Sequence, residues 1–281
     1  MERLHLLYKA SSLSYIRFGS GSKPAFCFHG YGEDATSFVF LEKYAGNEYS
    51  FFAIDLPFHG KTEWNDGLSC TTSDLMQIIE KILQENSQQP TTSPVRQSKN
   101  QQLSLIGFSL GGRVALSIYQ KMAPQIERLV LLAPDGLKVN AWYWLSTQTW
   151  MGNKLFAFTR KHPGWFFGFL KMLNALKLVN ASIFKFVSYY IGDKEARWLL
   201  YARWTTLRNL RPGLQKIKSL INDNETKVRL IYGKHDRIIL SSVGEKFKKG
   251  IEEHCTISVI HSGHQVLHEN HAAEILPALL H

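Results

Sequence analysis

Short apolar runs of strand length alternate along this chain with longer segments in which apolar residues recur at helical spacing. Leu75, Ile78 and Ile82 illustrate the second pattern, because they would share one face of a helix. Alternating strands and helices predict an α/β protein with a mostly parallel, doubly wound sheet that carries helices on both faces. We expect strands at 4–8, 13–18, 25–28, 49–54, 103–106, 128–132, 228–232 and 256–260. We expect helices at 36–44, at 72–85, from residue 110 onward, at 241–251 and at the C-terminus. A mobile polar loop is expected at 87–102.

One segment stands apart in composition. Residues 137–220 contain 14 Lys and Arg but only two acidic residues, a net charge of +12, whereas the whole chain carries +10. The same segment holds six of the seven tryptophans, and its pattern predicts several helices. We therefore expect residues 1–136 and 221–281 to form an α/β core, and residues 137–220 to form an inserted helical domain.

A serine lies between a predicted strand and a predicted helix. The run Gly107-Phe108-Ser109-Leu110-Gly111 fits G-x-S-x-G, and helical spacing begins directly after it. A strand, a sharp turn with serine at its tip and a helix together form a nucleophile elbow. The N-terminus of such a helix directs its N–H groups and its positive dipole end toward an oxyanion beside the serine.

Two further polar residues, Asp236 and His264, follow the last two predicted strands. Because the carboxyl ends of parallel strands meet at one edge of a sheet, we expect both to lie close to Ser109. A histidine titrates near neutrality and can take the serine proton, and an aspartate can hold the histidine in the correct tautomer. Asp135 also follows a strand and is the alternative acid.

These residues and the motifs around them resemble the α/β-hydrolase superfamily over nearly the whole chain. The order Ser, Asp, His along the sequence is the order of that superfamily. The resemblance implies an α/β-hydrolase fold, a Ser109–His264–Asp236 catalytic triad and a cap domain inserted at 137–220. The motifs that carry it are HGYG at 29–32, DLPFHG at 55–60, GFSLGG at 107–112, YGKHD at 232–236 and SGH at 262–264.

Backbone N–H groups near the serine are expected to form an oxyanion hole. One is that of Leu110, and the other comes from the loop after His29; by resemblance it is that of Tyr31. We expect His29 to order this loop rather than to take part in the chemistry. Glu33 and Asp34 are expected to cap the helix that follows.

The aromatic residues of the inserted segment are candidates for a substrate pocket. Trp142, Trp144, Arg203 and Trp204 are the residues we assign to it. The alternative is that these aromatic side chains form the core of the inserted segment itself.

Asp55 begins a turn at a strand end, and we interpret it as structural. His264 and His268 have the i, i+4 spacing that some metal sites use, but no carboxylate pattern fits around them. We therefore expect neither a metal nor another cofactor.

The expected reaction is hydrolysis of a small-molecule carboxylic ester or thioester through an acyl-enzyme. A serine at the elbow argues against the related dehalogenases and epoxide hydrolases, which use aspartate there. Hydrolysis of a C–C bond, or a lyase reaction, on the same triad is an alternative, and a non-catalytic receptor that keeps the triad is another. The substrate is chosen by the inserted segment, so the fold alone does not identify it.

The basic segment suggests a partner of negative charge. In its GxSLGG and DLPxxG motifs the chain partly resembles pimeloyl-carrier methyl ester esterases, which implies an acidic acyl carrier protein at the cap. The other interpretations are an anionic membrane surface and a solvated basic face without a partner. No nucleic-acid-binding motif accompanies the basic residues, so we expect no nucleic-acid partner.

The chain has 281 residues, of which 44% are hydrophobic, as in a globular protein. Cys27, Cys70 and Cys255 are an odd number without motif spacing, which predicts free thiols in a reducing compartment. We find no signal-peptide pattern after Met1 and no apolar run of about 18 residues that predicts a membrane span. We therefore expect a cytoplasmic protein.

Overall fold

The computed structural model describes residues 1–87, 102–138, 141–176 and 190–280. The mobile loop expected at 87–102 lies, apart from its two ends, outside the described residues. The chain forms two compact units. Unit 1 comprises Met1–Asp66, Thr71–Lys138 and Leu210–His281, and unit 2 comprises Gly67–Cys70 and Val139–Asn209.

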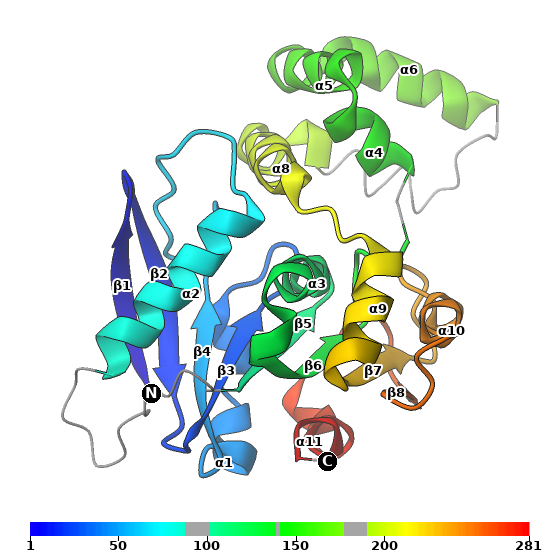
Figure 1. Ribbon diagram of the computed structural model, residues 1–281. Coiled ribbons are helices and arrows are strands. Elements are labelled where there is room, and N and C mark those ends of the chain that lie inside the picture. The colour runs from blue at the N-terminus through cyan, green and yellow to red at the C-terminus, as the bar shows by residue number, and fades with distance from the viewer. Residues whose placement is uncertain (88–101, 139–140, 177–189, 281) are drawn as a thin grey trace. The chain divides into compact units, whose positions relative to one another are not determined.

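Unit 1 is built on an eight-stranded sheet in the described part of the chain, with the order β1-β2-β4-β3-β5-β6-β7-β8 (Figure 1). β1 and β2 pair antiparallel, β2 pairs antiparallel with β4, and all the remaining neighbours are parallel. The predicted strands and the mostly parallel sheet are confirmed. The strands are β1 Glu2–Tyr8, β2 Ser11–Phe18, β3 Lys23–Phe28, β4 Tyr49–Ile54, β5 Leu103–Phe108, β6 Ile126–Leu132, β7 Lys227–Gly233 and β8 Cys255–Ile260.

Helices cover both faces of this sheet, as predicted. Alternate strand residues such as Cys27, Ile106 and Val130 pack with α1 and α11 in one apolar cluster, and these two helices lie together in Figure 1. On the other face α3 contacts α2 and α9. The ammonium group of Lys218 on α9 donates hydrogen bonds to backbone carbonyls of Lys246 and Lys249, in α10 and directly after it. The helices are α1 Leu41–Ala45, α2 Thr72–Ser87, α3 Leu110–Met122, α9 Leu214–Asn224, α10 Ser241–Lys248 and α11 Ala272–Leu280, with 3-10 turns η1 Ala35–Phe38, η2 Ala123–Gln125 and η4 Glu269–His271.

The helix expected at 36–44 is divided into η1 and α1. Ala35, Phe38 and Leu41 are buried in the cluster under the sheet and recur every three residues, which is the period of a 3-10 helix. The side chain of Asp34 accepts the N–H of Thr36 at 2.8 Å and so caps this tight turn. The expectation of one continuous helix is therefore wrong, whereas the capping role of Asp34 is confirmed.

Unit 2 is helical in its described part, with α4 Ala141–Gln148, α5 Trp150–Lys161, α6 Gly164–Ala175, α8 Lys194–Thr206 and η3 Leu207–Asn209. Its core is aromatic: Phe156 packs edge-on against Tyr201 and Trp204, at ring-centroid distances of 5.2 and 5.9 Å. Residues 210–220, which the composition placed with the inserted segment, cluster with unit 1, because α9 packs against α3 there.

All three cysteines are buried and free. Burial raises the pKa of the Cys27 thiol and raises that of Cys255 to about 12, so both remain protonated at neutral pH. Among the described helices, none is long and apolar enough to cross a bilayer.

The first turn of α3 approaches β3 closely. A Cβ on Gly111 would lie 1.8 Å from the carbonyl oxygen of Phe28, and a Cβ on Gly112 would lie 2.5 Å from the Cβ of Pro134. Both contacts are with rigid atoms that have little room to move. Glycine is therefore required at both positions by packing.

We predict that Gly111→Ala lowers the free energy of unfolding by about 3 kcal/mol or more, because the added methyl group overpacks a backbone contact. Gly168→Ala in α6 is the control, since no atom lies within 4 Å of the added Cβ. Removing a glycine from a helix interior should stabilise the protein by roughly 0.5–1 kcal/mol. Denaturant unfolding followed by circular dichroism measures both, and wild-type stability of the Gly111→Ala variant would contradict the packing argument.

Candidate active site

Ser109 occupies a strained turn between β5 and α3. Its backbone has φ 50° and ψ −114°, in the positive-φ region where residues other than glycine are uncommon. Three bonds hold it there: its N–H donates to the Leu132 carbonyl at 2.9 Å, and its carbonyl accepts the N–H groups of Gly112 at 2.9 Å and Asp135 at 2.8 Å. Such strain costs on the order of 1–3 kcal/mol and persists only where neighbouring structure enforces it. Here the end of β6 enforces it.

A continuous hydrogen-bonded chain starts at this serine. Ser109 Oγ lies 3.0 Å from His264 Nε2, and His264 Nδ1 lies 2.8 Å from Asp236 Oδ2. The structure therefore brings together the three residues that the sequence predicted to meet. The ring of Phe108 packs 5.5 Å from the imidazole of His264, centroid to centroid, and limits its movement.

The Asp236 carboxylate is oriented by its own loop. Its side chain has no exposed surface, whereas 22% of the His264 side chain is exposed. Asp236 Oδ1 accepts the backbone N–H groups of Ile238 at 2.7 Å and Ile239 at 3.0 Å. These bonds occupy one carboxylate oxygen and direct the other at the imidazole.

The loops that carry Asp236 and His264 are packed directly against each other. A Cβ on Gly233 would lie 1.9 Å from the Gly263 carbonyl oxygen. The N–H of His235 donates to the Ser262 carbonyl at 2.9 Å. The spacing of the acid and the histidine is thus set by backbone contacts between the ends of β7 and β8.

Asp135, the alternative acid, has a different partner. Its carboxylate forms an ion pair with Arg113 of α3, and its Oδ1 accepts the N–H of Gly136 at 2.7 Å. The Arg113 side chain is 8% exposed. Asp135 therefore joins the end of β6 to the helix behind the serine, and the structure does not place it on His264.

The two expected oxyanion donors lie on segments that touch. Leu110 is the first residue of α3, where helix geometry leaves the N–H without an intrahelical acceptor. Tyr31 lies in the loop after β3, and the contact of Gly111 with Phe28 brings that loop against the start of α3. A Cβ on Gly30 would lie 2.9 Å from the Phe108 ring. The elbow and this loop therefore form one packed unit.

His29 and Asp55 have the structural roles predicted for them. His29 Nε2 accepts the N–H of Leu56 at 3.1 Å, so its Nδ1 donates to the carbonyl of the next residue at 2.8 Å. Asp55 is fully buried and accepts from Arg3 at 2.6 Å and from the N–H of Ala35 at 2.7 Å. Both side chains join the loops after β3 and β4.

Glu33 has a role that sequence reasoning missed. It was expected to cap a helix, but its Oε2 accepts the N–H of Gly30 at 3.3 Å, and its Oε1 accepts Gln265 Nε2 at 2.8 Å. Glu33 thus links the loop of Tyr31 to the residue that follows His264. The capping expectation is wrong for Glu33, because the bond to Gln265 uses its carboxylate instead.

The residues assigned to a substrate pocket all lie in unit 2. Trp142 and Trp144 are 74% and 50% exposed. Trp204 packs on Tyr143 at 5.3 Å in the aromatic core of the unit, and Arg203 is half-buried on α8. Trp204 therefore belongs to the core of unit 2, which is the alternative role that the sequence analysis gave to these aromatic side chains.

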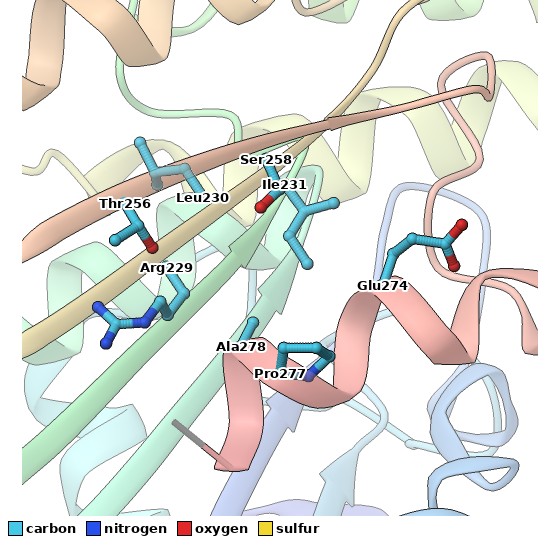
Figure 2. Close-up of a pocket in the computed structure, with 8 residues that line it drawn as sticks. All are labelled: Arg229, Leu230, Ile231, Thr256, Ser258, Glu274, Pro277 and Ala278. Atoms are coloured by element: carbon cyan, nitrogen blue, oxygen red, sulfur yellow. The ribbon is translucent and has the colours of Figure 1, made fainter.

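A pocket of about 290 Å³ opens between β7, β8 and α11 of unit 1 (Figure 2). Arg229 and Glu274 lie on different elements at its rim, with apolar side chains such as Pro277 between them. None of the predicted site residues lines it. The candidate active site is therefore defined by its hydrogen bonds rather than by this pocket.

The histidines near His264 are used in local structure. His268 Nδ1 accepts the N–H of Asn270 at 3.1 Å and caps η4, and His261 Nε2 lies 3.1 Å from His235 Nε2. Over the part of the chain that the structure describes, no group of three or more His, Cys, Asp or Glu side chains is placed to hold a metal ion.

Comparison with known families bears directly on this arrangement. The family Hydrolase_4, described as serine aminopeptidase S33, matches residues 23–271. The chain belongs to this family. It is therefore an enzyme, a hydrolase with the α/β-hydrolase fold, and the resemblance found in the sequence motifs is confirmed.

Individual relatives are more distant. The "Uncharacterized hydrolase YugF" of Bacillus subtilis is 20% identical over 260 residues, which covers 89% of this chain and 86% of the relative. A solved esterase of Thermogutta terrifontis has a TM-score of 0.64 at 16% identity, covering 99% of this chain and 97% of that one. A thioesterase domain from the curacin biosynthetic pathway has a TM-score of 0.59 at 16% identity, with 99% of both chains covered. At these identities the solved structures support the shared fold.

We predict that Glu33→Ala loosens the loops at 29–33 and 262–267 together, because it removes the acceptor that joins them. Hydrogen bonds to a charged group contribute about 1.5–3 kcal/mol, so amide hydrogen exchange in both loops should accelerate about tenfold or more. Glu63→Ala, which replaces an exposed glutamate of the same unit, is the control. Unchanged exchange in 262–267 would show that the Glu33–Gln265 bond does not couple the loops.

Proposed function

We propose that this hydrolase cleaves a carboxylic ester or thioester through a Ser109–His264–Asp236 catalytic triad. The observation that carries the proposal is the hydrogen-bonded chain, with 3.0 Å from Ser109 Oγ to His264 Nε2 and 2.8 Å from His264 Nδ1 to Asp236 Oδ2. Both distances lie within the range at which a nucleophile and its base exchange a proton.

In the proposed reaction, Ser109 Oγ attacks the substrate carbonyl carbon while His264 Nε2 takes the hydroxyl proton. Backbone N–H groups of Leu110 and Tyr31 stabilise the resulting oxyanion, and the dipole of α3 adds to that field. When the tetrahedral intermediate collapses, His264 returns the proton to the leaving alcohol or thiol. Water then attacks the acyl-enzyme carbonyl with His264 again as base. When this second intermediate collapses, His264 returns the proton to Ser109 Oγ and the carboxylic acid is released.

Several features of the molecule support this choice of bond. A serine at the elbow forms a hydrolysable acyl ester, and the solved structures similar to this chain include an esterase and a thioesterase domain by name. C–C bond hydrolysis on the same triad is the alternative from the same chemistry. The chain belongs to a hydrolase family, which does not support the alternative of a non-catalytic receptor.

Further assignments complete the proposal. We propose that the segment 137–220 acts as the cap of the core, that Arg203 contributes to substrate selection, and that the protein works in the cytoplasm on a small-molecule substrate. For the basic segment, an acidic carrier protein and an anionic membrane surface are alternative partners.

A fluorophosphonate probe should label wild-type protein at Ser109, and Ser109→Ala should abolish both labelling and ester turnover. The decisive measurement is a panel of p-nitrophenyl esters, acyl thioesters and aminoacyl arylamides, run in parallel on both proteins. The arylamides are included because the family description names an aminopeptidase. Labelling that persists in the alanine variant would refute the nucleophile, and turnover of arylamides alone would refute the ester assignment.

Asp236→Asn should reduce kcat by about four orders of magnitude, because an amide in that position favours the wrong imidazole tautomer. Asp135→Asn is the matched control: it follows a neighbouring strand but pairs with Arg113. We expect Asp135→Asn to reduce stability while leaving kcat within about tenfold of wild type. The opposite pattern would assign the acid to Asp135.

A further inference from the structure

Large apolar side chains are exposed on one part of the described chain far more than elsewhere. Of the 17 large hydrophobic residues that are exposed in the described part of the chain, 11 lie on or at the ends of α4, α5 and α6, which are coloured green in Figure 1. A soluble surface normally exposes such residues singly. The eleven are Trp142, Trp144, Leu145, Trp150, Met151, Leu155, Phe158, Trp165, Phe169, Met172 and Leu176.

Helix α5 shows most clearly that this exposure has a pattern. Its inner face packs on α8, through rings such as Phe156 on Tyr201. Its opposite face is also apolar: Trp150, Met151 and Leu155 are 71%, 74% and 51% exposed. An ordinary surface helix would place charged residues there. The outer face of α5 is therefore mostly apolar, with Lys154 as a basic residue among the exposed apolar side chains.

Helix α6 repeats the pattern. Trp165, Phe169, Met172 and Leu176 follow one another at intervals of four, three and four residues, so they form one stripe along the helix and its C-terminal end. Their exposed fractions are 40%, 41%, 51% and 60%. Leu170, on another face, is buried at 4%. The stripe is thus an apolar face of α6 that remains exposed within the described residues.

The charges around these stripes have one sign. Residues 141–176 contain four basic residues and no acidic residue. Lys161 and Lys171 are exposed, and Lys154 lies over the ring of Trp150 at 3.8 Å from its centroid. Long basic side chains of this kind can extend from an apolar stripe to reach negatively charged groups above it.

We propose that α4, α5 and α6 form a docking surface for a bilayer that contains anionic phospholipids. Exposed tryptophans with leucine, methionine and phenylalanine enter the boundary between headgroups and acyl chains, and flanking lysines bind lipid phosphates. The association is peripheral. It does not rest on the proposed function, because it needs no catalytic residue.

The composition of the surface favours a membrane over the other partners. An acidic protein is bound mainly through charge, but here apolar side chains outnumber the basic residues by 11 to four. A second copy of this chain would bring two surfaces of positive charge together, since the four basic residues have no acidic counterpart in 141–176. A lipid headgroup layer supplies both the apolar boundary and the negative charge.

The test uses full-length Ser109→Ala protein, so that hydrolysis of lipid does not complicate the measurement. Binding is measured by sedimentation with vesicles of phosphatidylcholine alone or mixed equally with phosphatidylglycerol. We expect binding to the mixed vesicles, weakened about tenfold or more by Met151→Ser/Leu155→Ser and by Lys161→Glu/Lys171→Glu. Quenching by brominated lipid reports depth, because six of the seven tryptophans lie in 137–220 and the seventh, Trp64, is buried.

Matched controls carry the same kinds of change, apolar to hydroxyl and Lys to Glu, in unit 1. Leu7→Thr/Val259→Thr replaces two apolar residues that are 78% and 51% exposed, and Lys121→Glu/Lys249→Glu reverses two exposed charges. Both should bind as the parent does. The proposal would be overturned if the protein bound pure phosphatidylcholine vesicles as well as mixed ones, or if the controls lost binding equally. It would also be overturned by a dimer in analytical ultracentrifugation that Met151→Ser/Leu155→Ser dissociates. Binding to an acidic carrier protein without binding to vesicles would overturn it as well.

Discussion

The contact between the first turn of α3 and the end of β3 is the constraint on which the candidate site depends. Gly111 allows the helix to approach the Phe28 carbonyl so closely that no side chain fits between them. That approach draws the chain through the positive-φ turn at Ser109, and hydrogen bonds from the end of β6 hold it there. The strain at one residue is therefore balanced by backbone contacts with two neighbouring strands.

From this point the loops at the carboxyl edge of the sheet are joined pairwise. The end of β7 meets the end of β8 where Gly233 touches Gly263, and the Asp236–His264 bond lies across the same junction. Glu33 and Gln265 join the loop after β3 to the loop after β8. The serine, the imidazole, the carboxylate and the expected backbone donors are thus carried by loops that restrain one another, and the proposed acyl transfer would need this preorganisation.

Local patterns allowed much of this to be predicted from the sequence. Apolar runs and turn residues located the strands, and the rule that parallel strands end at one edge placed Ser109, Asp236 and His264 together. Sequence left Asp135 as an alternative because both aspartates follow strands, and only the ion pair with Arg113 shows how Asp135 is used. The role of Glu33 was missed because its partner lies 232 residues away. The sequence analysis assigned residues 210–220 to the basic segment on their composition, and composition carries no information about the packing of α9 on α3.

The position of β8 in the sheet has a consequence for how the chain folds. β8 lies at one edge of the sheet, pairs only with β7 among the described strands, and follows the other seven described strands in the sequence. A nascent chain that has formed β5 and α3 already displays Ser109, but it has no imidazole beside it until β8 has joined the sheet. Under the proposed function, activation of Ser109 by His264 therefore depends on the docking of β8, and a chain that lacks β8 carries the serine without its proposed base.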